Sequence, residues 1–204
     1  MTANVDALLP LSFLEAVRNI DTPEDATDTE FVSDLRNKRL GLSDTVYTQI
    51  QRYTDAVRRS VRPPRDEAVA LARLIGRRPD AETGFRSAGR YLAKEAYLTL
   101  SPFTRRLVRR LPSMIARPVA LRQARRVARR YMNGRVTRMG SSVMLEVTDP
   151  VTLGVAPNAG GCTYYESAFR ELLRLLVGGS GAVEHVRCAG RDGEDKDQWR
   201  AEWR

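Results

Sequence analysis

Apolar side chains recur every three or four residues through the first two-thirds of the chain, which is the repeat of an α-helix with one buried face. Val46, Ile50, Tyr53 and Val57 follow this repeat, in a segment that begins at the candidate N-cap Ser43. Proline and glycine separate one such segment from the next. The pattern predicts helices over residues 12–20, 43–61, 65–76, 81–100, 102–111 and 118–132.

Beyond the Asn-Gly pair that follows these helices, apolar and polar side chains alternate, which is typical of β-strands. Val143, Leu145 and Val147 alternate in this way, and Gly140 with Ser141 supplies a tight turn ahead of them. The pattern predicts strands over residues 135–140, 142–149, 182–188 and 198–204, and a strongly amphipathic helix over residues 163–178.

These elements together predict an α+β fold, in which a helical N-terminal part packs on a small antiparallel sheet. We expect residues 1–42 to form an N-terminal helix followed by an acidic loop. We expect residues 43–204 to form a single domain, because a chain of 204 residues is most economically one core with a small appendage.

Composition narrows the class of protein. Hydrophobic residues make up 42% of the chain, which is enough for a packed core. No apolar run approaches the roughly 18 residues that a membrane-spanning helix needs, and the first residues lack the features of a secretory signal. Two cysteines do not make a disulfide framework. We therefore expect a cytoplasmic protein with reduced cysteines and no transmembrane span.

Positive charge is concentrated in one region. The chain carries a net charge of +9, and between Ser101 and Leu145 it contains twelve arginines and neither Asp nor Glu. In the helix predicted over residues 118–132, five arginines share one face at helical spacing. They are Arg122, Arg125, Arg126, Arg129 and Arg130. We call these five residues the arginine face.

A solvated helix normally places Glu among its arginines, and the arginine face has none. Two interpretations remain. Either acidic residues from elsewhere, such as those in residues 21–34, neutralise it, or an external anion does. An acidic protein surface or an anionic membrane fits the second interpretation and would place the protein at the membrane periphery. Nucleic acid fits less well, because no aromatic side chains interleave the arginines for base stacking.

The residue types that bind transition metals are rare here and occur only in the last quarter. Cys162, Cys188 and the single histidine, His185, are three of the four ligands that Zn²⁺ requires. Asp195 or Asp197 would supply the fourth, although Lys196 lies between them. Strict strand alternation also sends His185 and Cys188 to opposite faces, so both bind only if the strand ends or bulges there. The alternative is that both cysteines are buried apolar residues without a metal.

Three stretches resemble the 4-vinyl reductase domain, a family named after a bacteriochlorophyll-synthesis protein and Bet3-like in fold. "GGCTYYESAFRELLRLLVG" is similar to the Cys-aromatic-Tyr helix of the family, and "AVEHVRCAGRDGEDKDQWRAEW" to its final hairpin. "LARLIGRRPDAETGFRSAGRYLA" is a looser match to the helical part. The resemblance covers about residue 66 to the end of the chain.

The resemblance implies a zinc hairpin. In aromatic-sensing relatives, zinc is held by a Cys before the helix, an acidic residue on the next strand, a Cys three residues later and another Cys about eight residues beyond. Cys162, His185 and Cys188 match the first three positions. The sequence departs from the pattern at the fourth, where Asp195, Lys196 and Asp197 replace the cysteine.

The family's name does not imply a reductase activity for this chain. Reduction of a vinyl group needs a hydride donor, and no Gly-rich dinucleotide motif follows a predicted strand. We therefore expect a non-catalytic accessory protein that docks through the arginine face on an acidic or membrane-bound assembly. The resemblance makes a bacterial photosynthetic reaction centre with its antenna the most concrete partner, and a homodimer is also common in this fold.

The alternative is a sensor or carrier of a small apolar ligand, or a factor in bacteriochlorophyll synthesis. Relatives hold apolar ligands between the helices and the sheet. The aromatic side chains that would line such a pocket are Phe85, Tyr91, Tyr164, Tyr165 and Phe169. The same residues would equally form an ordinary core.

Overall fold

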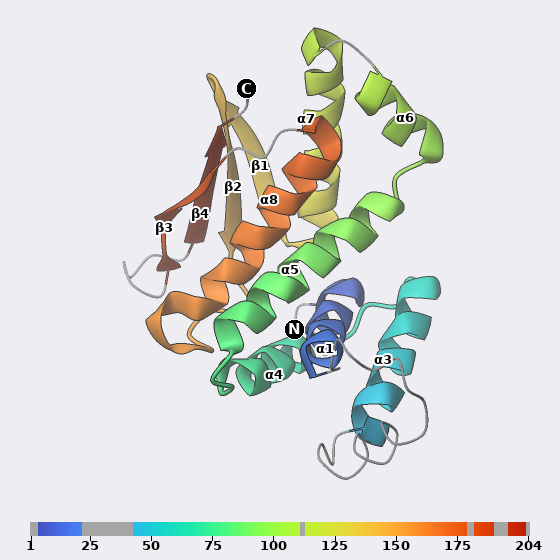
Figure 1. Ribbon diagram of the computed structural model, residues 1–204, viewed down its shortest axis with the longest axis vertical. Coiled ribbons are helices and arrows are strands. Elements are labelled where there is room, and N and C mark those ends of the chain that lie inside the picture. The colour runs from blue at the N-terminus through green and yellow to red at the C-terminus, as the bar shows by residue number, and fades with distance from the viewer. Residues whose placement is uncertain (1–3, 22–42, 111–112, 179–181, 190–195, 203–204) are drawn as a thin grey trace.

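Helices make up most of this protein, and the last third adds a small sheet (Figure 1). The computed structural model describes residues 4–21, 43–110, 113–178, 182–189 and 196–202. The helices are α1 (Leu8–Asp21), α3 (Ser43–Arg58), α4 (Arg65–Gly76), α5 (Ala81–Leu98), α6 (Pro102–Arg110), α7 (Ser113–Tyr131) and α8 (Thr163–Val177), with a short 3-10 helix, η1 (Pro157–Cys162), before α8. The strands are β1 (Gly134–Met139), β2 (Ser142–Thr148), β3 (Val183–Arg187) and β4 (Lys196–Glu202).

The four strands form one antiparallel sheet in the order β1-β2-β4-β3. Met139 pairs with Ser142 across the predicted two-residue turn, where Gly140 adopts a positive φ of 60°. Val143, Leu145 and Val147 of β2 are buried and alternate with more exposed residues. The predicted α+β fold and the alternation in β2 are confirmed.

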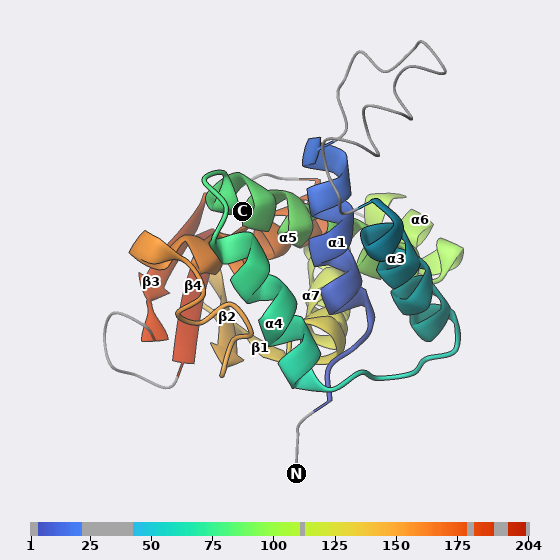
Figure 2. The ribbon, with the colours of Figure 1, turned by 90° about the horizontal axis from the view of Figure 1, so that it is seen from below.

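The helices form layers on one side of the sheet (Figures 1 and 2). Helix α8 lies across the sheet, α5 packs along α8, and α1 packs on α5, with α3 and α4 further out. Helices α5 and α8 pack closely against each other at Gly89. A Cβ atom at this position would collide with the carbonyl oxygen of Tyr164 and the hydroxyl of Ser167. Glycine therefore sets the distance between these two helices.

Helix α1 is buried along most of its length. Every residue from Leu8 to Ala16 is buried, and the Ser12 hydroxyl lies 3.0 Å from the Tyr164 hydroxyl of α8. This helix therefore belongs to the same core as the segment that follows residue 43. Residues 22–42, which include the predicted acidic loop, lie outside the described residues.

Two helices begin earlier than the sequence predicts. Helix α1 starts at Leu8 rather than at residue 12, because its first turns are apolar on all sides and show no amphipathic repeat. Helix α7 starts at Ser113 and contains Pro118 as its sixth residue. A proline this close to the start removes only the bond to the carbonyl of Met114, so the helix continues through it.

Candidate metal centre

The structure brings four candidate metal ligands together at one end of the sheet. Cys162 is the last residue of η1, His185 lies in β3, Cys188 follows β3, and Asp197 lies in β4. One ligand atom from each residue lies within 4.8 Å of the other three. The cluster therefore joins the start of α8 to the β3–β4 hairpin.

The two sulfur atoms of the cluster are at the spacing of a tetrahedral zinc site, and the pairs that involve Asp197 are wider, so they would draw together around an ion. The two sulfur atoms, Cys162 Sγ and Cys188 Sγ, are 3.6 Å apart. Cys162 Sγ lies 3.9 Å from Asp197 Oδ2, and His185 Nε2 lies 3.8 Å from Asp197 Oδ1. A zinc–sulfur bond of about 2.3 Å implies a sulfur–sulfur edge of about 3.8 Å in a tetrahedron, with slightly shorter mixed edges. The sulfur atoms are too far apart for a disulfide, whose length is about 2.05 Å.

A bulge in β3 lets His185 and Cys188 face the same side. His185 pairs with Trp199, whereas Arg187 pairs with Gln198, so β3 advances two residues while β4 advances one. The extra residue breaks the alternation, and the strand ends at Arg187 before Cys188 is reached. The strand both bulges and ends between His185 and Cys188, so the two side chains can bind the same metal ion.

Asp197, one of the two aspartates that the sequence offers as the fourth ligand, lies in the cluster. Its side chain is fully buried, and its Oδ1 accepts a hydrogen bond of 2.6 Å from the backbone N–H of Ala189. Lys196 points the other way and pairs with Glu146 at 3.4 Å, so its charge is kept away from the cluster. Asp195 lies outside the described residues.

His185 is held in place by Trp199. The two rings are stacked, with centroids 5.0 Å apart and an interplanar angle of 10°. His185 Nε2 is buried and has no hydrogen-bond partner among the described residues. A buried nitrogen without a partner is costly, and a metal ion between it and Asp197 would satisfy it, because the two bonds of about 2.1 Å together span the gap. Sequence reasoning missed this role of Trp199, which lies within the strand predicted over residues 198–204.

The protonation of Cys162 depends on whether a cation is bound. Burial, followed by the negative charge of Asp197 and the neighbouring Cys188 thiol, raises the pKa of the Cys162 thiol well above its usual range. The side chain therefore stays neutral next to the carboxylate when no cation is bound. A bound Zn²⁺ reverses this preference, because a coordinating thiol gives up its proton. Cys162, Cys188, His185 and Asp197 fit Zn²⁺ in residue type and burial, and they lie close enough together to converge on one ion.

This arrangement fits a structural site rather than a catalytic one. Four protein ligands fill the tetrahedron and leave no position for water or substrate. Three of the four residues are buried, and the cluster's role would be to tie the hairpin to the start of α8. His185 is the only histidine in the chain, so no second histidine remains for acid–base catalysis elsewhere.

The residues of the arginine face lie on the outer side of α7, and all five are exposed. Arg130 pairs with Asp6 at 3.4 Å and lies over the ring of Tyr131. Arg125 donates a hydrogen bond of 3.1 Å to the carbonyl of Val136. Within the described part of the chain, Arg122, Arg126 and Arg129 have no carboxylate partner.

The aromatic residues predicted to line an apolar pocket lie mainly in the core. Phe85, Tyr164, Tyr165 and Phe169 are fully buried, and Tyr91 is partly buried. Phe13, which the sequence did not single out, packs against both Phe85 and Tyr164. The rings of Tyr164, Tyr165 and Trp199 continue this series to His185. Because these rings fill space against one another, the ligand pocket stays a prediction.

No protein-family model matches the chain, and no curated protein matches it either.

Proposed function

We propose that this protein is a non-catalytic binding protein that docks through its arginine face on an acidic or membrane-bound assembly. The observation that carries the proposal is the exposure of five arginines on one helix, in a stretch from Ser101 to Leu145 that has no Asp or Glu. Twelve positive charges in this stretch attract an anionic surface. Among the described helices, none is both long and apolar enough to cross a membrane.

The few contacts that the arginine face makes within the protein leave most of its charge available. Only Arg130 has an ion pair with a described carboxylate, at Asp6. The ion pair is long, at 3.4 Å, and the Arg130 side chain is 44% exposed, so it contributes little to stability. The competing explanation is neutralisation by the acidic residues 21–34. Asp21 pairs with Arg78 at 2.6 Å rather than with the arginine face, and residues 22–34 lie outside the described residues.

A cytoplasmic protein docked at the membrane periphery follows from this proposal. The resemblance to 4-vinyl reductase domains makes a photosynthetic reaction centre with its antenna the most concrete partner. In this role the candidate metal centre would hold the β3–β4 hairpin, and the arginine face on α7, which packs on β1 at the other edge of the sheet, would make the contact. Nucleic acid fits the arginine face less well, because Tyr131 at the end of α7 is buried and cannot stack on bases, and the exposed Phe103 lies in α6 rather than among these arginines.

The double variant Arg122→Gln/Arg126→Gln tests the docking face. Both residues are exposed and lack a described carboxylate partner, and Gln has nearly the helix propensity of Arg, so the fold should be unchanged. Each arginine near an anionic surface is worth about 1 kcal/mol, so we expect about a thirtyfold loss of affinity. Binding of the full chain to membranes that carry reaction centres, measured by co-sedimentation, reports the change.

The matched control is Arg73→Gln/Arg77→Gln, which removes two exposed arginines at the end of α4 and should leave binding unchanged. Wild-type binding should also weaken as the salt concentration rises from 0.1 M to 1 M, since the screening length falls from about 10 Å to about 3 Å. If the α7 variant instead loses stability and keeps its affinity, the arginines are paired internally and the docking proposal is wrong.

A further inference from the structure

A cavity of about 110 Å³ lies where the end of α7 meets the start of α4. Residues from five separate segments line it, among them Arg62, Arg65, Arg129, Arg130, Asn133 and Tyr165. A single water needs only about 10–15 Å³ on the same measure. The cavity therefore has room for a group of several non-hydrogen atoms.

The cavity carries more positive charge than its own carboxylates neutralise. Asp149 pairs with Arg65 at 2.6 Å, and Asp6 pairs with Arg130 at 3.4 Å. Arg62 and Arg129 also line the cavity, and neither has a carboxylate partner among the described residues. Four arginines against two aspartates leave two positive charges at the cavity. This surplus matches a dianion.

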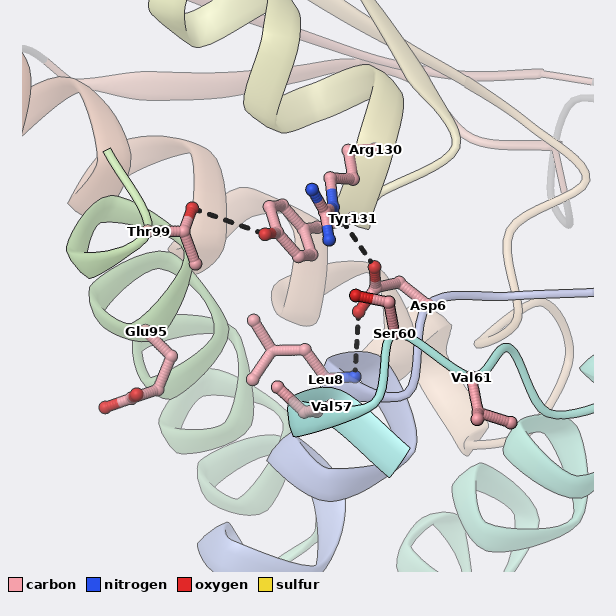
Figure 3. Close-up of a pocket in the computed structure, with 9 residues that line it drawn as sticks. All are labelled: Asp6, Leu8, Val57, Ser60, Val61, Glu95, Thr99, Arg130 and Tyr131. Carbon is pink, nitrogen blue, oxygen red and sulfur yellow. Dashed lines mark hydrogen bonds and ion pairs between the residues drawn. The ribbon is translucent and has the colours of Figure 1, made fainter. Parts of the chain in front are cut away.

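A second cavity next to it shows that this surplus is local. Figure 3 shows the neighbouring cavity, which shares Asp6, Arg130 and Tyr131 with the first. Asp6 forms part of both walls and is held by the N–H of Leu8 at 3.1 Å as well as by Arg130. The second cavity contains Glu95 and only one arginine, so its lining is negative overall. An anion is therefore expected to bind in the first cavity and not in the second.

Tyr165 adds a buried hydrogen-bond donor to the first cavity. The Tyr165 side chain is 1% exposed, and its hydroxyl oxygen accepts a hydrogen bond of 3.3 Å from the N–H of Val151. No acceptor for the hydroxyl proton occurs among the described residues. Burial raises the pKa of Tyr165 above its usual range, so the proton is retained at neutral pH.

The backbone around this cavity is also unusual. Asn133 and Asp149 line it, and both adopt a positive φ, of 50° and 53°. The third described non-glycine residue with a positive φ, Ser60, lines the neighbouring cavity. Such conformations are uncommon outside glycine and cluster at binding sites.

We propose that the cavity formed by Arg62, Arg65, Arg129, Arg130 and Tyr165 binds a phosphate group. Arginine forks pair with phosphate oxygens through two parallel hydrogen bonds, and a phosphate has enough oxygens to engage both unpaired arginines and the Tyr165 hydroxyl at once. A carboxylate, with two oxygens and one charge, would leave part of this donor set unused. The site stands apart from the proposed docking function, although it shares Arg129 and Arg130 with the arginine face.

The test measures inorganic phosphate binding to the full chain by isothermal titration calorimetry at constant ionic strength. We expect Arg62→Gln/Arg129→Gln to weaken phosphate binding at least tenfold. The control Arg73→Gln/Arg77→Gln loses the same charge and should stay within twofold of the wild type. An equal loss in both variants, or no phosphate binding by the wild type, overturns the proposal.

Tyr165→Phe separates the donor role from a packing role. The ring stays in the core, so we expect the variant to fold and to bind phosphate about three- to tenfold more weakly. A loss of thermal stability with unchanged phosphate affinity would mean that Tyr165 only holds Val151, and the proposed donor set would be wrong.

Two sources of the phosphate group are distinguished with vesicles of phosphatidylcholine that contain phosphatidic acid. If the group belongs to a lipid, Arg62→Gln, which leaves the arginine face intact, loses vesicle binding and glycerol 3-phosphate displaces the wild type from the vesicles. If it belongs to a soluble ester, glycerol 3-phosphate binds the wild type without displacing it from the vesicles, and Arg62→Gln keeps its vesicle binding. Arg122→Gln/Arg126→Gln should keep its phosphate affinity in either case, so a failed docking proposal and a failed phosphate site give different results.

Discussion

Replacing Cys188 with serine is expected to release zinc from the purified protein and to lower its melting temperature by about 8–16 °C. An ion present at a thousand times its dissociation constant stabilises the folded state by about 4 kcal/mol. In a chain of this size each kcal/mol is worth about 2–4 °C. The loss should concentrate in the β3–β4 hairpin, because Cys188 and Asp197 attach it to Cys162. Elemental analysis and differential scanning calorimetry measure the two effects.

Two aspartate variants sharpen this prediction. Asp197→Asn removes a ligand that lies in the cluster and should weaken zinc binding, whereas Asp195→Asn should leave the zinc content near one equivalent. A wild-type protein that is stable and free of metal after purification with added zinc would contradict the prediction. The two cysteines would then be buried apolar side chains and no more.

Replacing Gly89 with alanine is expected to lower the free energy of unfolding by about 3 kcal/mol or more. The added methyl group would collide with the carbonyl of Tyr164 and the hydroxyl of Ser167, and a backbone carbonyl moves only if α8 moves. The corresponding fall in melting temperature is about 6–12 °C or more. Urea denaturation followed by circular dichroism measures the change.

Gly84→Ala in the same helix is the matched control. A Cβ atom there lies 3.2 Å from the Cγ2 methyl group of Ile75 and 4.0 Å from the Cδ1 methyl group of Ile20, so a shift of a few tenths of an ångström in one side chain accommodates it. Both variants gain up to about 1 kcal/mol of helix propensity, so Gly84→Ala should be neutral or slightly stabilising. Equal effects of the two substitutions would show that the contact between α5 and α8 is not as close as described.

The candidate metal centre could be predicted from the sequence in its residue types but not in its geometry. Cys162, His185 and Cys188 could be identified as candidate ligands because the chain has no other Cys or His. The burial of Asp197 in the cluster depends on which side chains of β4 face inward, and the position of the bulge depends on the pairing of β3 with β4. Neither is encoded in local spacing, since both follow from the register between two strands.

The fold was predictable wherever one face of an element is buried. Strand β2 and helix α8 are such cases, and both form as the pattern predicts. Helix α1 is not, because apolar residues that contact α5 on one side and α3 or α4 on another remove the amphipathic signal. The cavity proposed to bind phosphate could not be predicted from the sequence either. Arg62, Arg129 and Tyr165 are far apart in the sequence, and only the tertiary structure brings them together.

The burial of α1 has a consequence for how the chain is made. Ser12 leaves the ribosome 152 residues before its partner Tyr164. At a synthesis rate of about 5–20 residues per second, this apolar segment remains uncovered for roughly 8–30 s until α8 has been made. During synthesis it is therefore an exposed hydrophobic stretch, a natural binding site for chaperones. Substitutions in α1 should consequently reduce the yield of folded protein in cells more than they reduce the stability of the protein once folded.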